Sequence, residues 1–142
     1  MAANSATISP LKLPVGTVSL MTTRNGAQTR PTANGGGAHK LTYVIEEFRK
    51  LDPEMQAQTM LTFVHVCLTP DITIKELRDR IGVASSTISR NIAFLSDSRS
   101  PGRVGLGIVH TEEDPVDRRA KRVRLTSKGE RVWKTLESYM RG

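Results

Sequence analysis

The segment from Asp114 to Gly129 constrains the fold more than any other part of this sequence. Its first two residues, Asp-Pro, favour a turn, because proline fixes its own φ and keeps the residue before it out of the α region. From 122 to 125, arginines alternate with apolar residues, which is the period-two pattern of a β-strand. Thr126 can then cap a helix. The segment therefore predicts a β-hairpin with an arginine-rich tip, joined directly to a helix.

The charge of the chain is distributed unevenly along its length. The 142 residues carry a formal net charge of +7. Residues 1–39 contain three basic and no acidic residues, 40–110 contain nine basic and eight acidic, and 111–142 contain nine basic and six acidic. The basic surplus thus lies in the N-terminal segment and around the hairpin. This distribution favours a polyanionic partner.

Domain organisation follows from composition. Residues 1–38 are rich in Ala, Thr, Asn, Pro and Gly and contain no acidic residue, so we expect a flexible or disordered tail. The length of the remainder, 39–142, suits one folded domain with a modest core.

Two amphipathic helices are predicted first in this domain. Apolar residues recur at intervals of three and four from Lys40 to Leu51. A second helix is expected to begin at 52–54, because Asp-Pro-Glu supplies a cap, a first-turn proline and a first-turn acid. It is expected to end near Thr69. Its predicted buried residues are Met60, Phe63, Val64 and Cys67.

A helix-turn-helix pattern follows. Thr73 and Glu76 have the spacing of a capping box and predict the start of a third helix. Gly82 suits the tight turn after it. A fourth helix is expected over 85–97, with a small polar face on the outside. Its predicted buried residues are Ile88, Ile92 and Leu95.

The rest of the chain predicts a hairpin and a final helix. After a loop over 98–105, strands are expected at Leu106–Thr111 and Ala120–Leu125, and a helix at about 127–140. The hairpin tip, 112–120, is called the wing below. The fold class is therefore mainly α with a small β-hairpin (α+β), a winged helix-turn-helix.

The outer face of helix 85–97 has the chemistry needed to read a DNA groove. A major groove admits one helix, and arginine and short polar side chains read base edges there. Hydroxyl groups and amides at a helix N-terminus also suit phosphate oxygens. The candidate residues on this helix are Ser85, Ser86, Thr87, Ser89 and Arg90.

The wing and the strand after it supply a second set of candidates. A minor groove attracts arginine through its narrow, negative potential. Asp117 is expected to hold the Arg119 guanidinium by a charge-assisted hydrogen bond. The other basic residues are expected to contact phosphates. The full set is Asp117, Arg118, Arg119, Lys121, Arg122 and Arg124, with Lys128 as a further phosphate contact.

The segment resembles the wing of the MarR family of winged-helix transcription regulators. That family's pattern is roughly Asp-Pro-x-Asp-Arg-Arg-Ala, a strand ending in Leu-Thr, and then x-Lys-Gly. Ten residues match it: Asp114, Pro115, Asp117, Arg118, Arg119, Ala120, Leu125, Thr126, Lys128 and Gly129. The resemblance covers about 40–140. It implies a DNA-binding regulator, expected to be a repressor, that reads the major groove with helix 85–97 and the minor groove with wing 112–120.

Two local features depart from the family's pattern. The usual capping serine of the reading helix is Ala84 here, so Ser85 is expected to cap instead. The loop 96–105 is also longer than the family's usual link into the first wing strand.

A third departure concerns assembly. The chain stops at Gly142, after one C-terminal helix, whereas the family dimerises through longer terminal helices beside a ligand pocket. This shortness argues against a small-molecule effector. Two interpretations stay open for Trp133, Tyr139 and Met140: a compact homodimer through 40–51 and 127–142, or packing on the first helix of the same chain.

No catalytic residues, cofactor or metal site are predicted. The three histidines lie on different predicted elements without ligand spacing, and no phosphate-binding glycine loop or catalytic triad pattern occurs. Cys67 lies in an apolar run and is interpreted as an ordinary thiol, with a redox role as the alternative. With no long apolar segment and no leader pattern, we expect a nucleoid-associated, cytoplasmic protein of a bacterial, archaeal or phage-infected cell.

Two alternatives to a transcription regulator remain open from the sequence. One is a winged-helix protein that serves plasmid or phage replication or partition. The other is an interaction module whose winged helix binds a protein.

Overall fold

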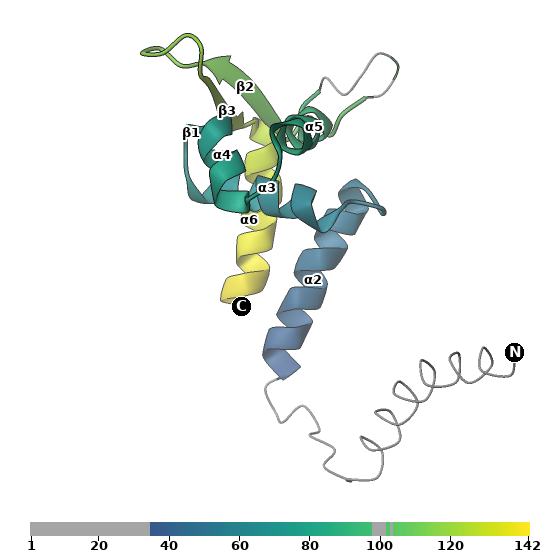
Figure 1. The fold of residues 1–142 in the computed structure, drawn as a ribbon. Coiled ribbons are helices and arrows are strands. Elements are labelled where there is room, and N and C mark those ends of the chain that lie inside the picture. Colours follow the sequence, from purple (N-terminus) through teal and green to yellow (C-terminus); the bar gives the residue numbers. More distant parts are fainter. Residues whose placement is uncertain (1–34, 98–101, 103) are drawn as a thin grey trace, which may run out of the picture. The chain divides into compact units, whose positions relative to one another are not determined.

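The computed structural model describes residues 35–97, 102 and 104–142 (Figure 1). The segment expected to be a flexible tail and most of the loop 98–105 therefore lie outside the described residues. The elements in chain order are α2 (Gly35–Leu51), α3 (Ala57–Leu68), β1 (Ile72–Thr73), α4 (Ile74–Ile81), α5 (Ser85–Leu95), β2 (Val109–Glu113), β3 (Lys121–Leu125) and α6 (Ser127–Arg141). This order confirms the predicted α+β winged helix-turn-helix.

The sheet has three antiparallel strands in the order β1-β3-β2. β2 and β3 form the predicted hairpin, with Val109 opposite Leu125 and Glu113 opposite Lys121. The two-residue strand β1 adds to the other edge of β3, where Ile72 pairs with Val123. Figure 1 shows the hairpin projecting beyond the helices, so that the wing lies at its free end.

The core lies where α3, α4, α5 and α6 meet the sheet. Its completely buried side chains include Phe63, Ile72, Leu77, Ile88, Leu95, Ile108, Val123 and Leu136. Burial of Ile88, Ile92 and Leu95 on α5 confirms the predicted inner face. Because α5 is fixed by this face, its opposite side is presented to solvent in a defined orientation.

The start of α3 was predicted wrongly. Residues 52–54 form a turn, in which the Asp52 carboxylate accepts from the Glu54 amide at 2.8 Å and the Asp52 carbonyl accepts from the Met55 amide at 3.1 Å. The helix begins only at Ala57. Aspartate and proline favour a turn as well as a cap, and here the turn brings Met55 into the core, where it is 7% exposed.

The buried face of α3 is wider than the predicted one, since the predicted Met60, Val64 and Cys67 are half-buried and pack against the core. Phe63 is buried as expected, but its buried neighbours are Thr59, Thr62 and Val66. The Thr62 hydroxyl donates to the Gln58 carbonyl at 2.7 Å, and further bonds join these threonines to Asn91 of α5. Polar groups can be buried when they are hydrogen-bonded, which is why apolar periodicity missed this face.

Several other boundaries also differ from the prediction, among them the start of β3 at Lys121 and the end of β2 at Glu113. α2 begins at Gly35, inside the segment assigned to the tail. α5 ends at Leu95 rather than Asp97. β2 begins at Val109 rather than Leu106, because the amides of Leu106 and Ile108 donate to the last carbonyls of α5, on Phe94 and Leu95, at 3.0 and 2.8 Å. The amides of these two residues are therefore bonded to the end of α5 and not to β3.

The end of α6 packs against α2 of the same chain. The rings of Tyr43 and Tyr139 lie 5.6 Å apart, and the Tyr139 hydroxyl donates to the Glu47 carboxylate at 3.3 Å. Lys40 donates from Nζ to the Met140 carbonyl at 3.0 Å. Of the two interpretations of this region, packing on the first helix is thus present in the structure. No helix in the described ranges is long and apolar enough to cross a membrane.

Candidate DNA-binding surface

The turn between α4 and α5 sets the position of the predicted reading helix. Thr73 and Glu76 form the expected capping box at the start of α4. Gly82 ends α4 in the left-handed conformation, with φ of 73°, which glycine adopts without strain. α5 then starts at Ser85 after the N-cap Ala84. The expectation that Ser85 caps the helix is wrong: its side chain does not accept from the helix amides.

The outer face of α5 is exposed as predicted. Ser85, Ser86, Ser89 and Arg90 are exposed, and Thr87 is half-buried. Ser89 donates its hydroxyl to the Ser85 carbonyl at 2.9 Å, and the Ser85 hydroxyl accepts from Arg78 at 3.4 Å. In the part of the chain that the structure describes, the side chains of Ser86 and Arg90 have no hydrogen-bond or ion-pair partner. These two side chains are therefore free to contact a ligand.

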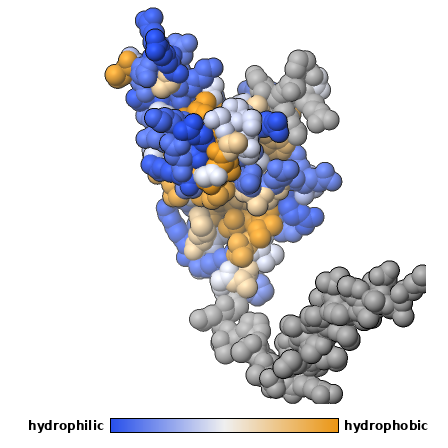
Figure 2. Space-filling model, in the orientation of Figure 1, coloured by the Kyte–Doolittle hydropathy of each residue, from blue (hydrophilic) through white to orange (hydrophobic). Residues whose placement is uncertain are grey.

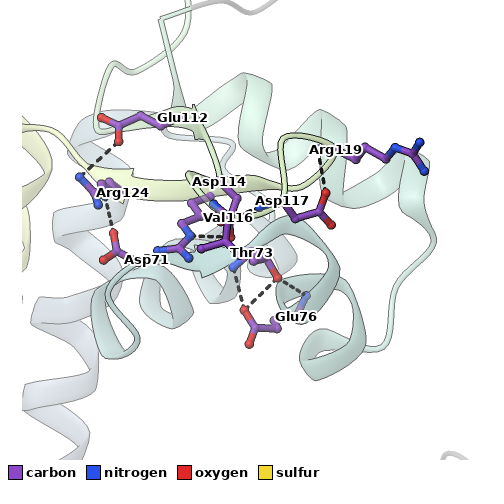
Figure 3. A network of polar contacts seen from close by, with 10 residues as sticks. Asp71, Thr73, Glu76, Glu112, Asp114, Val116, Asp117, Arg119 and Arg124 are labelled. Carbon is purple, nitrogen blue, oxygen red and sulfur yellow. Dashed lines mark hydrogen bonds and ion pairs between the residues drawn. The ribbon is translucent and has the colours of Figure 1, made fainter.

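The buried carboxylate of Asp114 holds the wing together through hydrogen bonds. Its Oδ1 accepts from the amides of Val116 and Asp117 at 2.8 and 3.2 Å, and its Oδ2 accepts from Arg122 Nε at 2.7 Å (Figure 3). The Arg122 bond, followed by the Val116 amide, lowers the pKa of Asp114 to about 2. The carboxylate therefore remains charged at neutral pH and joins the turn of the wing to β3.

Asp117 acts on the backbone rather than on the guanidinium of Arg119. Its Oδ1 accepts from the Arg119 amide at 3.0 Å, and its carbonyl accepts from the Ala120 amide at 2.8 Å. The predicted bond between the Asp117 carboxylate and the Arg119 guanidinium is absent from the described residues. Figure 3 shows the Arg119 side chain directed away from Asp117. Aspartate side chains commonly bond an amide two residues on, and this bond leaves the guanidinium unpaired.

The basic residues near the wing fall into two groups. Arg118, Arg119 and Lys121 are exposed and, within the described ranges, have no side-chain partner. By contrast, Arg122 is bound to Asp114, and Arg124 is paired with Asp71 and with Glu112, the latter at 3.2 Å (Figure 3). The predicted phosphate contacts of Arg122 and Arg124 thus compete with ion pairs inside the protein.

Sequence reasoning missed the acidic partners of these arginines. The sequence indicates Asp114 as the start of a turn and as part of the wing pattern but not as a partner of Arg122, although an aspartate at that place can accept backbone bonds. The pairing of Asp71 with Arg124 joins residues 53 positions apart in the sequence. No local pattern signals such a contact, because it depends on β1 lying beside β3.

Neither a metal site nor a reactive thiol is found in the described part of the chain. It contains no group of three or more His, Cys, Asp or Glu side chains that could hold a metal ion. Cys67 is half-buried, and burial raises the pKa of its thiol to about 12. The thiol is thus protonated at neutral pH, which agrees with its interpretation as an ordinary packing residue.

The elements and their exposed faces define a winged helix-turn-helix protein. No protein-family model matches the sequence, and no curated protein matches it. Solved structures do match it, with many at high probability. A MarR-like transcriptional regulator from Thermotoga maritima is 27% identical with a TM-score of 0.52, over 63% of this chain and 57% of that one. This chain thus spans little more than half of that regulator.

Two further structures extend the comparison. The PcaV transcriptional regulator from Streptomyces coelicolor, solved with its natural ligand, is 22% identical with a TM-score of 0.51, over 81% of this chain and 77% of that one. MepR of S. aureus, solved in complex with DNA, is 14% identical with a TM-score of 0.59, over 72% of this chain and 77% of that one. The fold is therefore the MarR-like winged helix that the wing sequence resembles. The first two of these neighbours are transcriptional regulators.

Proposed function

We propose that this protein is a sequence-specific, double-stranded DNA-binding regulator of transcription, and that it acts as a repressor. In this proposal α5 lies in the major groove and the wing enters the minor groove. One observation carries it: the two elements that a winged helix applies to DNA each present an exposed arginine without an internal partner, Arg90 on α5 and Arg119 on the wing. The complex of MepR with DNA supports the same use of a similar fold.

The two arginines have different tasks in this proposal. Arg90 recognises a base edge, which it can do with two parallel hydrogen bonds to guanine. Ser86 and Ser89 flank it and contact either bases or phosphates. Arg119 enters the narrow groove, where attraction depends on the width and negative potential of the groove. A repressor role follows if the bound site overlaps a promoter, because a protein on the duplex then excludes the polymerase.

Equilibrium binding of the two arginine variants to duplex DNA tests the function. The target comes from selection of bound sequences from a random duplex pool. Arg90→Ala is expected to lower affinity for the target about 10- to 100-fold and to leave affinity for unrelated duplexes nearly unchanged, because a bidentate base contact contributes ~1–3 kcal/mol of discrimination. Arg119→Ala is expected to lower affinity for all AT-rich duplexes and to weaken the salt dependence.

Lys134→Ala is the matched control, because it removes one positive charge from an exposed position on α6, on a different side of that helix from the exposed Met140. It is expected to behave as the wild type. Failure of the wild type to select any duplex, or equal affinities of all four proteins for the selected DNA, would contradict the function. The second result would favour a surface that binds another kind of partner.

We further propose that the protein binds DNA as a homodimer through α2 and α6. Exposed apolar side chains remain on these helices, including Leu41 at 59%, Ile45 at 41% and Met140 at 47%. Leu41 and Ile45 are four residues apart and share one helix face. In Figure 2 hydrophobic surface gathers near α2 and α6, whereas the hairpin end is mainly hydrophilic. Such patches commonly mark an association surface, and a two-fold dimer would select a palindromic site.

Solution mass tests the dimer. Leu41→Glu is expected to shift the protein from twice the chain mass towards the chain mass at micromolar concentration, because it places a charge in an apolar interface. Val116→Glu is the control, since it changes a 90% exposed valine of the wing in the same way. A wild type that stays monomeric, or an unchanged mass for Leu41→Glu, would contradict this assembly.

A further inference from the structure

A second basic site lies between the helix-turn-helix and the wing. A cavity of about 260 Å³ opens there, called the α4–wing groove below, and it is lined by Thr73, Ile74, Lys75, Arg119, Ala120 and Lys121. Lys75 belongs to the first turn of α4, whereas Lys121 begins β3. The groove thus brings together three cationic residues from segments more than 40 positions apart in the sequence. Lys75 carries no role in the function proposed above.

The positive charges of the α4–wing groove are not neutralised inside the protein. In the described ranges, the side chains of Lys75, Arg119 and Lys121 have no hydrogen-bond or ion-pair partner, and all three are exposed. By comparison, Arg122 on the same strand is bound to Asp114. Chains normally disperse or pair such charges, so a cavity lined by three free cations is suited to an anion.

Among the described residues, none of the nearby carboxylates pairs with a cation of the groove. Glu76 on α4 accepts with Oε2 from the amide and hydroxyl of Thr73, at 2.8 Å each. Asp117 accepts from the Arg119 backbone amide. Glu113 lies opposite Lys121 in the strand register but forms no ion pair with it among the described residues. Within the described ranges, the three cations of the groove are therefore left without a carboxylate partner, although acidic residues lie close to them.

We propose that the α4–wing groove binds a backbone phosphate of the DNA, next to the minor groove that Arg119 enters. This inference rests on the proposed function and adds Lys75 as a contact. A phosphodiester fits because it carries one negative charge and oxygen acceptors that ammonium and guanidinium groups bind from several sides. A phosphate held here would fix the distance between α4 and the wing on the duplex, so that both reading elements enter their grooves in one register.

Salt-dependent binding of Lys75→Ala provides the first test. The variant is expected to reduce the slope of log affinity against log salt by about 0.9 in magnitude, the value for one lost phosphate contact. Affinity should fall by a similar factor for target and unrelated duplexes, because phosphates carry no base identity. Lys134→Ala is again the control and should keep the wild-type slope. An unchanged slope for Lys75→Ala, while Arg90→Ala still loses the target, overturns the groove but not the function.

Neutralising single phosphates locates the contact. Target duplexes with one methylphosphonate linkage at successive positions are bound to wild type and to Lys75→Ala. At one position beside the minor-groove contact, the methylphosphonate is expected to lower the affinity of the wild type but hardly that of Lys75→Ala. The reason is that the neutral linkage and the lysine substitution each remove the same lysine–phosphate contact. Equal losses for both proteins at every position overturn the proposal. If instead inorganic phosphate binds the free protein tightly through Lys75 and no linkage is coupled to Lys75, the groove serves a free anion and the proposal also fails.

Discussion

Gly129→Ala is expected to lower the free energy of unfolding by ~1–3 kcal/mol, the usual cost of overfilling a packed site. An ideal Cβ on Gly129 would lie 2.0 Å from the carbonyl oxygen of Ile108. That oxygen cannot move away easily, because it accepts from the Thr126 amide at 3.1 Å and lies next to the start of β2. The variant must therefore displace α6 from the sheet. Urea or thermal unfolding followed by circular dichroism measures the loss.

The control variant is expected to change the stability of the protein in the opposite direction. Gly37→Ala changes another helical glycine, in α2, where an added Cβ meets nothing within 4 Å. Alanine favours a helix over glycine, so this variant is expected to raise stability by up to about 1 kcal/mol. A Gly129→Ala protein as stable as the wild type would contradict the close approach of α6 to Ile108. A loss in Gly37→Ala as well would show a cause other than that contact.

Gly129 illustrates what sequence reasoning could and could not supply. The pattern around it marked the resemblance and the cap at Thr126, whose side chain accepts from the Gly129 amide at 3.1 Å as expected. The need for glycine, however, comes from Ile108, 21 positions earlier. Local patterns of caps and periodicity thus predicted the helix, whereas the reason for one of its residues depended on how α6 meets the sheet.

The same division holds for the candidate site. Periodicity identified the outward face of α5 and the exposed tip of the wing, because both depend on which neighbouring residues are buried. It could not separate Arg119 from Arg122, since both are arginines in one short basic run. The structure separates them: Asp114 holds Arg122, while the guanidinium of Arg119 is left for a partner. Charge runs predict where cations gather, and tertiary contacts determine which remain available.

Asp114→Asn is expected to weaken DNA binding by about tenfold or more through loss of order in the wing, since ~1.4 kcal/mol corresponds to a factor of ten. The carboxylate joins three donors, on Val116, Asp117 and Arg122. An amide carries less charge for Arg122 and has only one oxygen to accept. The amides of Val116 and Asp117 should therefore exchange their hydrogens faster in the variant. Hydrogen exchange and duplex binding measure the two effects.

A charge-matched control distinguishes order from electrostatics. Glu113→Gln removes one negative charge from the neighbouring residue, whose side chain has no partner in the described residues. If only net charge mattered, both variants would bind the DNA polyanion more tightly than the wild type. The structural role of Asp114 predicts opposite signs: tighter binding for Glu113→Gln and weaker binding for Asp114→Asn. Tighter binding by both would show that the wing keeps its form without this carboxylate.

The pH dependence of the wing follows from the same carboxylate. Its pKa of about 2 in the folded protein lies below the ordinary value of 3.8, because the bond from Arg122 and the amide bonds favour the charged form. A lowered pKa means that the stabilisation is fully present above pH 3.8 and is lost as the pH falls through 2. Amide exchange at Val116 should therefore stay slow down to pH 3.8 in the wild type, after correction for intrinsic exchange, and rise below it. In Asp114→Asn this rise of the Val116 exchange rate at low pH should be missing, because no titrating group remains at that position. An equally large rise of the exchange rate in the variant would assign the acid sensitivity of the wing to another carboxylate.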